Sequence, residues 1–179
     1  MAAQQTDRQR PEYEVVVADT PELVQACYDI RIEVFVTEQG FSIDDEMDQY
    51  DNGAQVVHLL LTVLELSSAN VNGEPKRVPV GVVRIITAKN KLGRLAILKP
   101  YRSYGFGKVL VESVHDWAKS QLKKDDEKVQ IIHAIPFYEK CGYHAEGSQF
   151  EEDGDGNRHH QELNAYDIKK GKDRIVFDV

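Results

Sequence analysis

The sequence predicts a single α/β domain, built on one mixed and mostly antiparallel sheet with helices on both faces. Two observations carry this prediction. Apolar runs of strand length alternate with stretches of helical periodicity along most of the 179 residues. The segment 91–120 also has the pattern of a strand, a glycine-containing turn and a helix, which is typical of a right-handed crossover between parallel strands. The domain is expected to span residues 12–168, between a disordered tail at 1–11 and a C-terminal tail at 169–179.

Strands and helices are expected in a fixed order along the chain. Apolar and β-branched runs predict strands at 13–18, 56–66, 78–87, 95–98, 129–134, 143–150 and 160–168. Helices are expected from Pro21 to near Gly40, from Gly107 to Ser120, and over the short segment 135–140. The runs at 56–66 and 78–87 are expected to pair antiparallel through a loop at 70–79.

Each long helix is expected to bury one apolar stripe. Asp19 or Thr20 can cap the first helix, and Pro21 suits its first turn. Its apolar side is formed by Leu23, Ala26, Cys27, Ile30, Val34 and Phe35. The stripe of the second long helix consists of Leu110, Val111, Val114, Trp117 and Ala118.

Composition and charge exclude several classes of protein. A formal net charge of -8 gives little electrostatic reason to bind nucleic acid or anionic lipid, so a partner is expected to be cationic or neutral. Two cysteines are too few for a disulfide framework and suit a reducing compartment. The sequence has no apolar run of membrane-spanning length and no apolar signal region. We therefore expect a cytoplasmic or nucleocytoplasmic protein that is not secreted.

The turn before the second long helix has the features of a phosphate-binding loop. Arg102, Gly105 and Gly107 follow R-x-x-G-x-G spacing, and Lys108 adds a second charge. A helix start attracts anions through its unpaired N–H groups and its dipole, and glycine lets a ligand approach the backbone. Because short glycine patterns are weak evidence, a plain strand-to-helix connection is the alternative.

Two other phosphate loops fit this turn less well. A P-loop would need glycine in place of Arg102 and serine or threonine in place of Val109. A dinucleotide-binding turn would need a third glycine in place of Leu110.

Two segments match the motifs of a known family. Leu95-Ala96-Ile97 with the turn 102–108 (RSYGFGK) resembles motif A of the GNAT acetyltransferases. The segment 134–143 (AIPFYEKCGY) resembles motif B, A-x-x-F-Y-x-K-x-G-F, about thirty residues further on. The similarity extends from about Tyr13 to Ile168. The pattern R-x-x-V-F-V-x-E-Q from Arg31 is similar to the ElaA-like branch, although Leu163 stands where that branch often has methionine.

The resemblance implies acetyl-CoA as the acyl donor. The backbone of Leu95, Ala96 and Ile97 would run beside the pantetheine arm, where the strand bulges and leaves an N–H group free for the thioester oxygen. His133 would end the neighbouring strand beside the cofactor. The residues that would wrap the pyrophosphate are Arg102, Ser103, Tyr104, Gly105, Phe106, Gly107 and Lys108.

Proton transfer is expected to involve Tyr138. A phenol with a pKa of about 10 can protonate the departing thiolate, although Phe137 and Tyr138 could instead be packing aromatics. The expected central strand contains no carboxylate to act as the base. Candidate bases, acting directly or through water, are Glu38, Asp48, His58, His133 and His160. The four of these other than His133 are also the candidate acceptor-binding residues.

The carboxylates between Glu38 and Asp51 have two interpretations. They attract a cationic amine, or they form a solvated loop. A calcium loop is disfavoured, because the required glycine and glutamate are absent both here and after Asp153. His159-His160 lacks a third ligand at metal-binding spacing, so no metal site is expected.

The resulting hypothesis is an acetyl-CoA-dependent N-acetyltransferase that acylates the primary amine of a small molecule. Cys141 has no arrangement for nucleophilic catalysis, so transfer should be direct. The alternatives are a protein or peptide N-acetyltransferase, a non-catalytic acetyl-CoA sensor or scaffold, and an enzyme that uses a longer acyl-CoA. A homodimer through the region 143–168 is plausible, since this superfamily often pairs through sheet edges.

Overall fold

The computed structural model describes residues 10–51, 53, 55–69, 75–89, 91–121, 139–151, 159–166 and 174–177. Four strands form the main sheet: β1 (Tyr13–Val17), β2 (Val56–Ala69), β3 (Pro75–Ile86) and β4 (Lys91–Ile97). The α-helices are α1 (Pro21–Arg31), α2 (Ile43–Glu46) and α3 (Phe106–Gln121). A π-helix, η1 (Ile32–Glu38), follows α1, and two short 3₁₀ helices, η2 (Thr87–Lys89) and η3 (Lys99–Tyr101), flank β4. Three more strands follow: β5 (Tyr143–Glu151), β6 (His159–Tyr166) and β7 (Arg174–Phe177).

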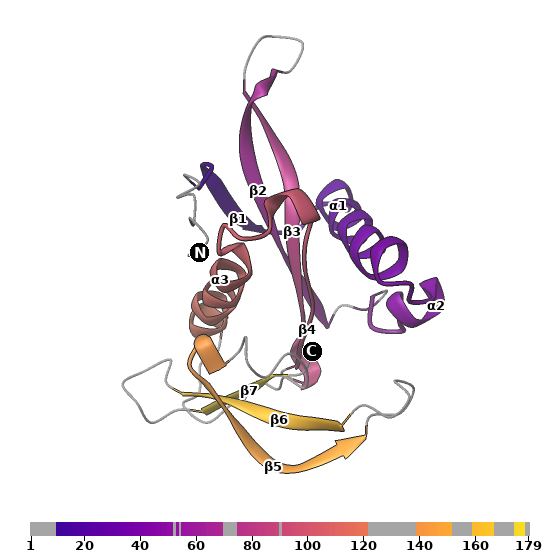
Figure 1. Cartoon of the computed structure of the whole chain (residues 1–179), viewed down its shortest axis with the longest axis vertical. Helices are drawn as coiled ribbons and strands as arrows, with labels where there is room; N and C mark the ends of the chain where they lie inside the picture. The colour runs from indigo at the N-terminus through magenta and orange to yellow at the C-terminus, as the bar shows by residue number, and fades with distance from the viewer. Residues whose placement is uncertain are drawn as a thin grey trace, which may run out of the picture.

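The main sheet has the order β1-β2-β3-β4, and every neighbouring pair is antiparallel. The strands β5, β6 and β7 form a second antiparallel sheet (Figure 1). The predicted α/β class with mostly antiparallel pairing is confirmed, but the described strands form two sheets instead of one. The strand expected at 129–134, and with it the parallel crossover, lies outside the described residues.

Helices cover both faces of the main sheet, as predicted (Figure 1). Alternate residues of β2 point to opposite faces, because side chains alternate along a strand. Leu59, Leu61 and Val63 pack with α3, whereas Leu60 packs with α1. The apolar stripes of both helices are confirmed, and their buried members are Cys27, Ile30, Val34, Leu110, Val111, Val114 and Ala118.

The first helix begins as expected and ends differently. Thr20 is its cap, since the Leu23 backbone N–H donates to the Thr20 hydroxyl at 3.3 Å, and Pro21 is its first residue. After Arg31 the chain continues as a π-helix to Glu38, which the sequence analysis did not predict. This wider turn is uncommon and often occurs at functional sites.

Two other predictions require correction. The loop expected at 70–79 is too long, because β2 and β3 stay paired as far as Ala69 and Pro75. The expected C-terminal tail contains β7, which pairs with the last half of β6 from Leu163↔Phe177 to Tyr166↔Arg174. In both places the polar composition favours a loop or tail, but pairing with a neighbouring strand makes the segment a strand.

His115 connects α3 to β5 by a short hydrogen bond with the Tyr143 hydroxyl, and burial lowers its pKa from 6.5 to about 4. A histidine with a lowered pKa binds its proton more readily in the unfolded chain, so stability is lost as the pH falls below 6.5. Between pH 7 and pH 5, we expect the free energy of unfolding to fall by about 2 kcal/mol more in wild type than in His115→Gln. Urea titrations at both pH values measure this difference, and equal losses would contradict it.

Candidate active site

The turn between β4 and α3 presents the backbone of a helix start. Ser103 has φ 73° and Gly105 has φ 77°, both in the left-handed region where glycine is favoured. The Val109 N–H donates to the Gly105 carbonyl at 3.2 Å, which begins the hydrogen bonding of α3. The N–H groups of the first turn therefore have no carbonyl partner within the helix, and they form the kind of site that binds phosphate.

Arg102 connects this turn to two other elements. Its Nε donates to the Ile97 carbonyl at 2.9 Å, which ties the turn to the end of β4. Its two terminal nitrogens bind the two carboxylate oxygens of Glu38, each at 2.6 Å. The hydrogen bond from Arg102 lowers the pKa of Glu38, which is therefore ionised at neutral pH. The structure thus brings a predicted cofactor residue and a predicted acceptor residue into one ion pair.

The other residues of the turn differ in exposure. The Phe106 side chain is buried and packs edge-on against Tyr13, with ring centroids 5.5 Å apart, so only its backbone is available to a ligand. Lys108 is mostly exposed, with its ammonium 3.7 Å from Glu112. Tyr104 lies beside Phe106, with ring centroids 5.8 Å apart.

Arg10 is a further cation at this turn that the sequence analysis missed. Its Nη2 lies 2.8 Å from the position that a Cβ on Gly105 would occupy. Its guanidinium lies over the rings of Tyr13 and Phe106, at 5.7 Å and 6.0 Å from their centroids. The residue falls in the segment expected to be a disordered tail, where no local pattern marks it.

The strand β4 contains a bulge directly before Leu95. Its register with β3 changes between Val82↔Ala96 and Arg84↔Gly93, so β4 has one extra residue here. Arg94 has φ 53°, one of two positive values among the described residues other than glycine. The bulge that the resemblance implied is therefore present. The other edge of β4 is hydrogen-bonded to none of the described strands.

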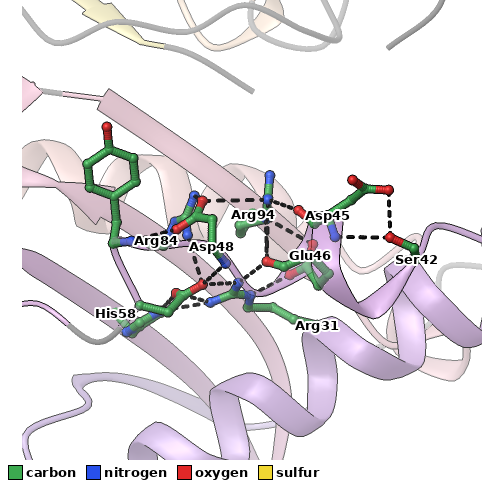
Figure 2. A network of polar contacts seen from close by, with 10 residues as sticks. Arg31, Ser42, Asp45, Glu46, Asp48, His58, Arg84 and Arg94 are labelled. Atoms are coloured by element: carbon green, nitrogen blue, oxygen red, sulfur yellow. Dashed lines mark hydrogen bonds and ion pairs between the residues drawn. The ribbon is translucent and has the colours of Figure 1, made fainter. Parts of the chain in front are cut away.

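Three arginines and three carboxylates form a network beside the bulge, in which four members are buried and Arg94 and Asp48 are partly exposed (Figure 2). The cations come from α1, β3 and β4, and the carboxylates from α2 and the loop after it. Their charges cancel in number. The members are Arg31, Arg84, Arg94, Glu46, Asp48 and Asp51, and we call this set the arginine–carboxylate network.

Arg31 is the centre of the network and is fully buried. Its Nε donates to Glu46 Oε1 at 2.5 Å, and Nη1 and Nη2 donate to the two Asp51 oxygens at 2.6 Å and 2.9 Å. Burial alone would lower the pKa of Arg31, but the hydrogen bonds to Asp51 and Glu46 outweigh burial and raise that pKa above its ordinary value. Burial likewise raises the pKa of Asp51, yet Arg31, His58 and Arg84 hold it well below its ordinary value.

His58 lies against this network and is 4% exposed. Its Nε2 is 3.2 Å from Arg31 Nη1 and 3.7 Å from Asp51 Oδ1. Burial lowers its pKa, so the ring is neutral at pH 7. Asp48, a second candidate base, accepts from Arg84 at 2.8 Å. Both side chains are therefore held by arginines.

The two interpretations of the acidic segment apply to only part of it. Glu46 and Asp51 are buried and Asp48 is ion-paired, so these three carboxylates are neither solvated nor uncompensated, whereas Asp44 and Asp45 are exposed. The signal for this was present in the sequence. Arg31 lies next to Ile30 in the apolar stripe of the first helix, and Arg84 interrupts an apolar strand. Both positions are expected to be buried, and buried arginines require carboxylate partners.

Several predicted site residues cannot be located. Tyr138 and His133 lie outside the described residues, together with most of the motif B segment. The backbone of His160 lies on β6 opposite Phe150, and its side chain is outside the described part of the structure. Among the residues that the structure describes, no group of three or more His, Cys, Asp or Glu side chains could hold a metal ion. No helix in the same part of the chain is long and apolar enough to cross a membrane.

Comparisons with known proteins identify the fold and the family. The model of the Acetyltransferase (GNAT) domain matches residues 66–156, just over half of the chain. A Bacillus subtilis (strain 168) protein named "Putative acetyltransferase BSU40680" is 35% identical over 133 residues, covering 73% of this chain and 83% of that protein. The chain therefore belongs to the GNAT acetyltransferase family, and it is an N-acetyltransferase type of acyltransferase.

Two solved structures have the same fold. An acyl-CoA N-acyltransferase from Pseudomonas aeruginosa superposes with a TM-score of 0.63 at 20% identity, covering 85% of this chain and 98% of that chain. Escherichia coli ElaA superposes with a TM-score of 0.60, also at 20% identity, covering 86% of this chain and 97% of that chain. At this level of identity the two structures show the fold alone.

Proposed function

We propose that this chain uses acetyl-CoA to acetylate a primary amine, most simply of a small molecule, by direct transfer. The observation that carries the proposal is the joined geometry of the β4 bulge and the turn 102–108. The strand β4, one edge of which is hydrogen-bonded to none of the described strands, leads into a helix start that is flanked by Arg102 and Lys108. This arrangement suits an extended pantetheine arm that ends in a pyrophosphate.

In this proposal each part of the site has one task. The turn 102–108 binds the pyrophosphate, with Arg102 held in place by Ile97 and Glu38. The backbone of Leu95, Ala96 and Ile97 lines the pantetheine, and an N–H group of this segment that points away from β3 stabilises the oxyanion that forms when the amine attacks. His133 lies near the cofactor. Tyr138 protonates the departing CoA thiolate.

The amine must attack in its neutral form, and the candidate bases fall into two groups. Asp48 and His58 are engaged in or against the arginine–carboxylate network, which assigns them a structural role. Glu38 is likewise engaged by Arg102, so His133 and His160 are the candidates that we retain, acting directly or through water.

Direct transfer is supported by the state of the cysteines. Burial raises the pKa of Cys27 to about 12, and it also raises the pKa of Cys141. Both are thiols at neutral pH, which makes them poor nucleophiles.

The likeness to E. coli ElaA in fold, together with the pattern from Arg31 to Gln39, supports placing this chain in the ElaA-like branch.

The proposal is tested by following CoA release from acetyl-CoA with small cationic, neutral and anionic amines and with peptides bearing a free N-terminus or lysine. We expect turnover with at least one small primary amine, and an intact protein mass without an added acetyl group. Turnover with peptides only would support the protein acetyltransferase. Tight binding of acetyl-CoA without acetylation of any acceptor would support a cofactor-binding module and contradict the proposal.

A further inference from the structure

Arg94 adopts a backbone conformation that residues with a Cβ rarely adopt. Its φ of 53° lies in the left-handed region, and Gly93, which would adopt it without strain, is the preceding residue. Strained residues persist only where their surroundings hold them, and they cluster at functional sites. The contacts of Arg94 therefore need an explanation beyond the shape of the strand.

The guanidinium of Arg94 is bound to the end of α2 (Figure 2). Its Nη2 donates to the Asp45 carbonyl at 2.7 Å, and its Nε donates to the Glu46 carbonyl at 3.3 Å. Its Nε also lies 2.9 Å from Glu46 Oε2, and Nη2 lies 3.7 Å from Asp48. These carbonyls belong to the last turn of α2, which has no helical N–H groups left to pair with them.

Glu46 extends this connection to the core. One of its carboxylate oxygens contacts Arg94, and the other accepts from the fully buried Arg31 on α1. Arg31 Nη2 also donates to the Glu46 carbonyl at 2.7 Å. The bulge of β4 is thus fixed through Arg94 to α2, and through Glu46 to α1.

We infer that Arg94 is a positioning residue for acyl transfer, which it serves by fixing the direction of the N–H groups of Leu95–Ile97. This inference rests on the proposed function, since it assumes that the thioester lies along that segment. Arg94 touches no reacting atom in this account. Its contacts set the bulge, and the bulge sets where the N–H groups point. An N–H group that points away from the position of the oxyanion, or lies too far from it, stabilises the oxyanion poorly.

The test uses acetyl-CoA labelled with ¹³C at the thioester carbonyl and NMR of the bound complex. A hydrogen bond to the carbonyl oxygen polarises the bond and moves its resonance downfield. In Arg94→Gly, which keeps the left-handed conformation accessible but removes the guanidinium, we expect most of the binding-induced shift to be lost. Binding of unlabelled CoA, measured by calorimetry, should be unchanged because the turn 102–108 is intact.

Two further variants make the test decisive. Arg94→Lys keeps the charge but cannot make the paired contacts, so it should show the same loss even if Arg94→Gly folds poorly. Arg77→Ala, which removes an exposed arginine paired with Glu12 and Glu14, should keep the wild-type shift. A wild-type shift in the Arg94 variants would overturn the inference. Absence of acetyl-CoA binding by wild type would instead overturn the proposed function.

Discussion

Replacing Arg31 by methionine is expected to lower the free energy of unfolding by about 3–5 kcal/mol. The guanidinium is fully buried and binds Glu46 and Asp51, of which Glu46 is 3% and Asp51 9% exposed. Methionine fills similar space but leaves two buried carboxylates without their main partner. An isolated buried charge costs far more than the pair contributes, which makes this one of the largest single-residue effects expected for the chain.

Equilibrium urea denaturation of wild type and Arg31→Met at a pH near 7 measures the effect. Arg77→Met is the matched control, because Arg77 also pairs with two carboxylates but its side chain is 37% exposed. The control should lose no more than about 1 kcal/mol. Equal losses in the two variants would mean that the network is not the buried structure described above.

Replacing Tyr138 by phenylalanine is expected to lower kcat for acetyl transfer by about 10²–10⁴-fold, the usual contribution of a positioned general acid. The change removes only the phenolic oxygen, so the departing thiolate must take its proton from water. The binding of acetyl-CoA should be unaffected, because the nucleotide end is assigned to the turn 102–108. The prediction follows from the resemblance to motif B, since Tyr138 lies outside the described residues.

Steady-state kinetics with an amine that supports turnover give kcat and KM for each variant. Tyr13→Phe is the control, because Tyr13 is 38% exposed and contributes its ring to packing against Phe106. It should keep the wild-type kcat. An unchanged kcat in Tyr138→Phe would remove the phenol from the mechanism and leave proton transfer to solvent or to another residue.

The elements that could be predicted from the sequence are those whose signal is local and periodic. The stripe through Leu110 and Val114 repeats every three to four residues, and it was sufficient to place α3. Apolar runs placed β2 and β3 in the same way. The turn after β4 was predicted from electrostatics, because the effect of Gly105 and of the helix start depends on neighbouring residues alone.

The features that were missed depend on residues far apart in the sequence. Arg31 and Asp51 are twenty residues apart, and Arg94 and Asp45 are forty-nine apart. Arginines within apolar stretches, such as Arg31, indicate that carboxylate partners exist, but no period shows which carboxylates these are. Arg10 was missed for the same reason, since it lies beside Gly105 only because β1, which follows it in the chain, pairs with β2 in the sheet.

The central claim is that the turn 102–108 binds the cofactor, and a thermal melt with and without acetyl-CoA tests it most directly. Ligand at about 100 times its Kd should stabilise wild type by about 2.7 kcal/mol, a shift of several degrees. Gly105→Glu places a carboxylate at the phosphate site and should abolish the shift. Gly40→Glu adds the same charge at a glycine of similar φ, 79°, and should keep it; its added Cβ meets nothing within 4 Å, whereas a Cβ on Gly105 would lie 2.8 Å from Arg10. A well-folded wild type without a shift, or an equal shift in Gly105→Glu, would contradict the claim.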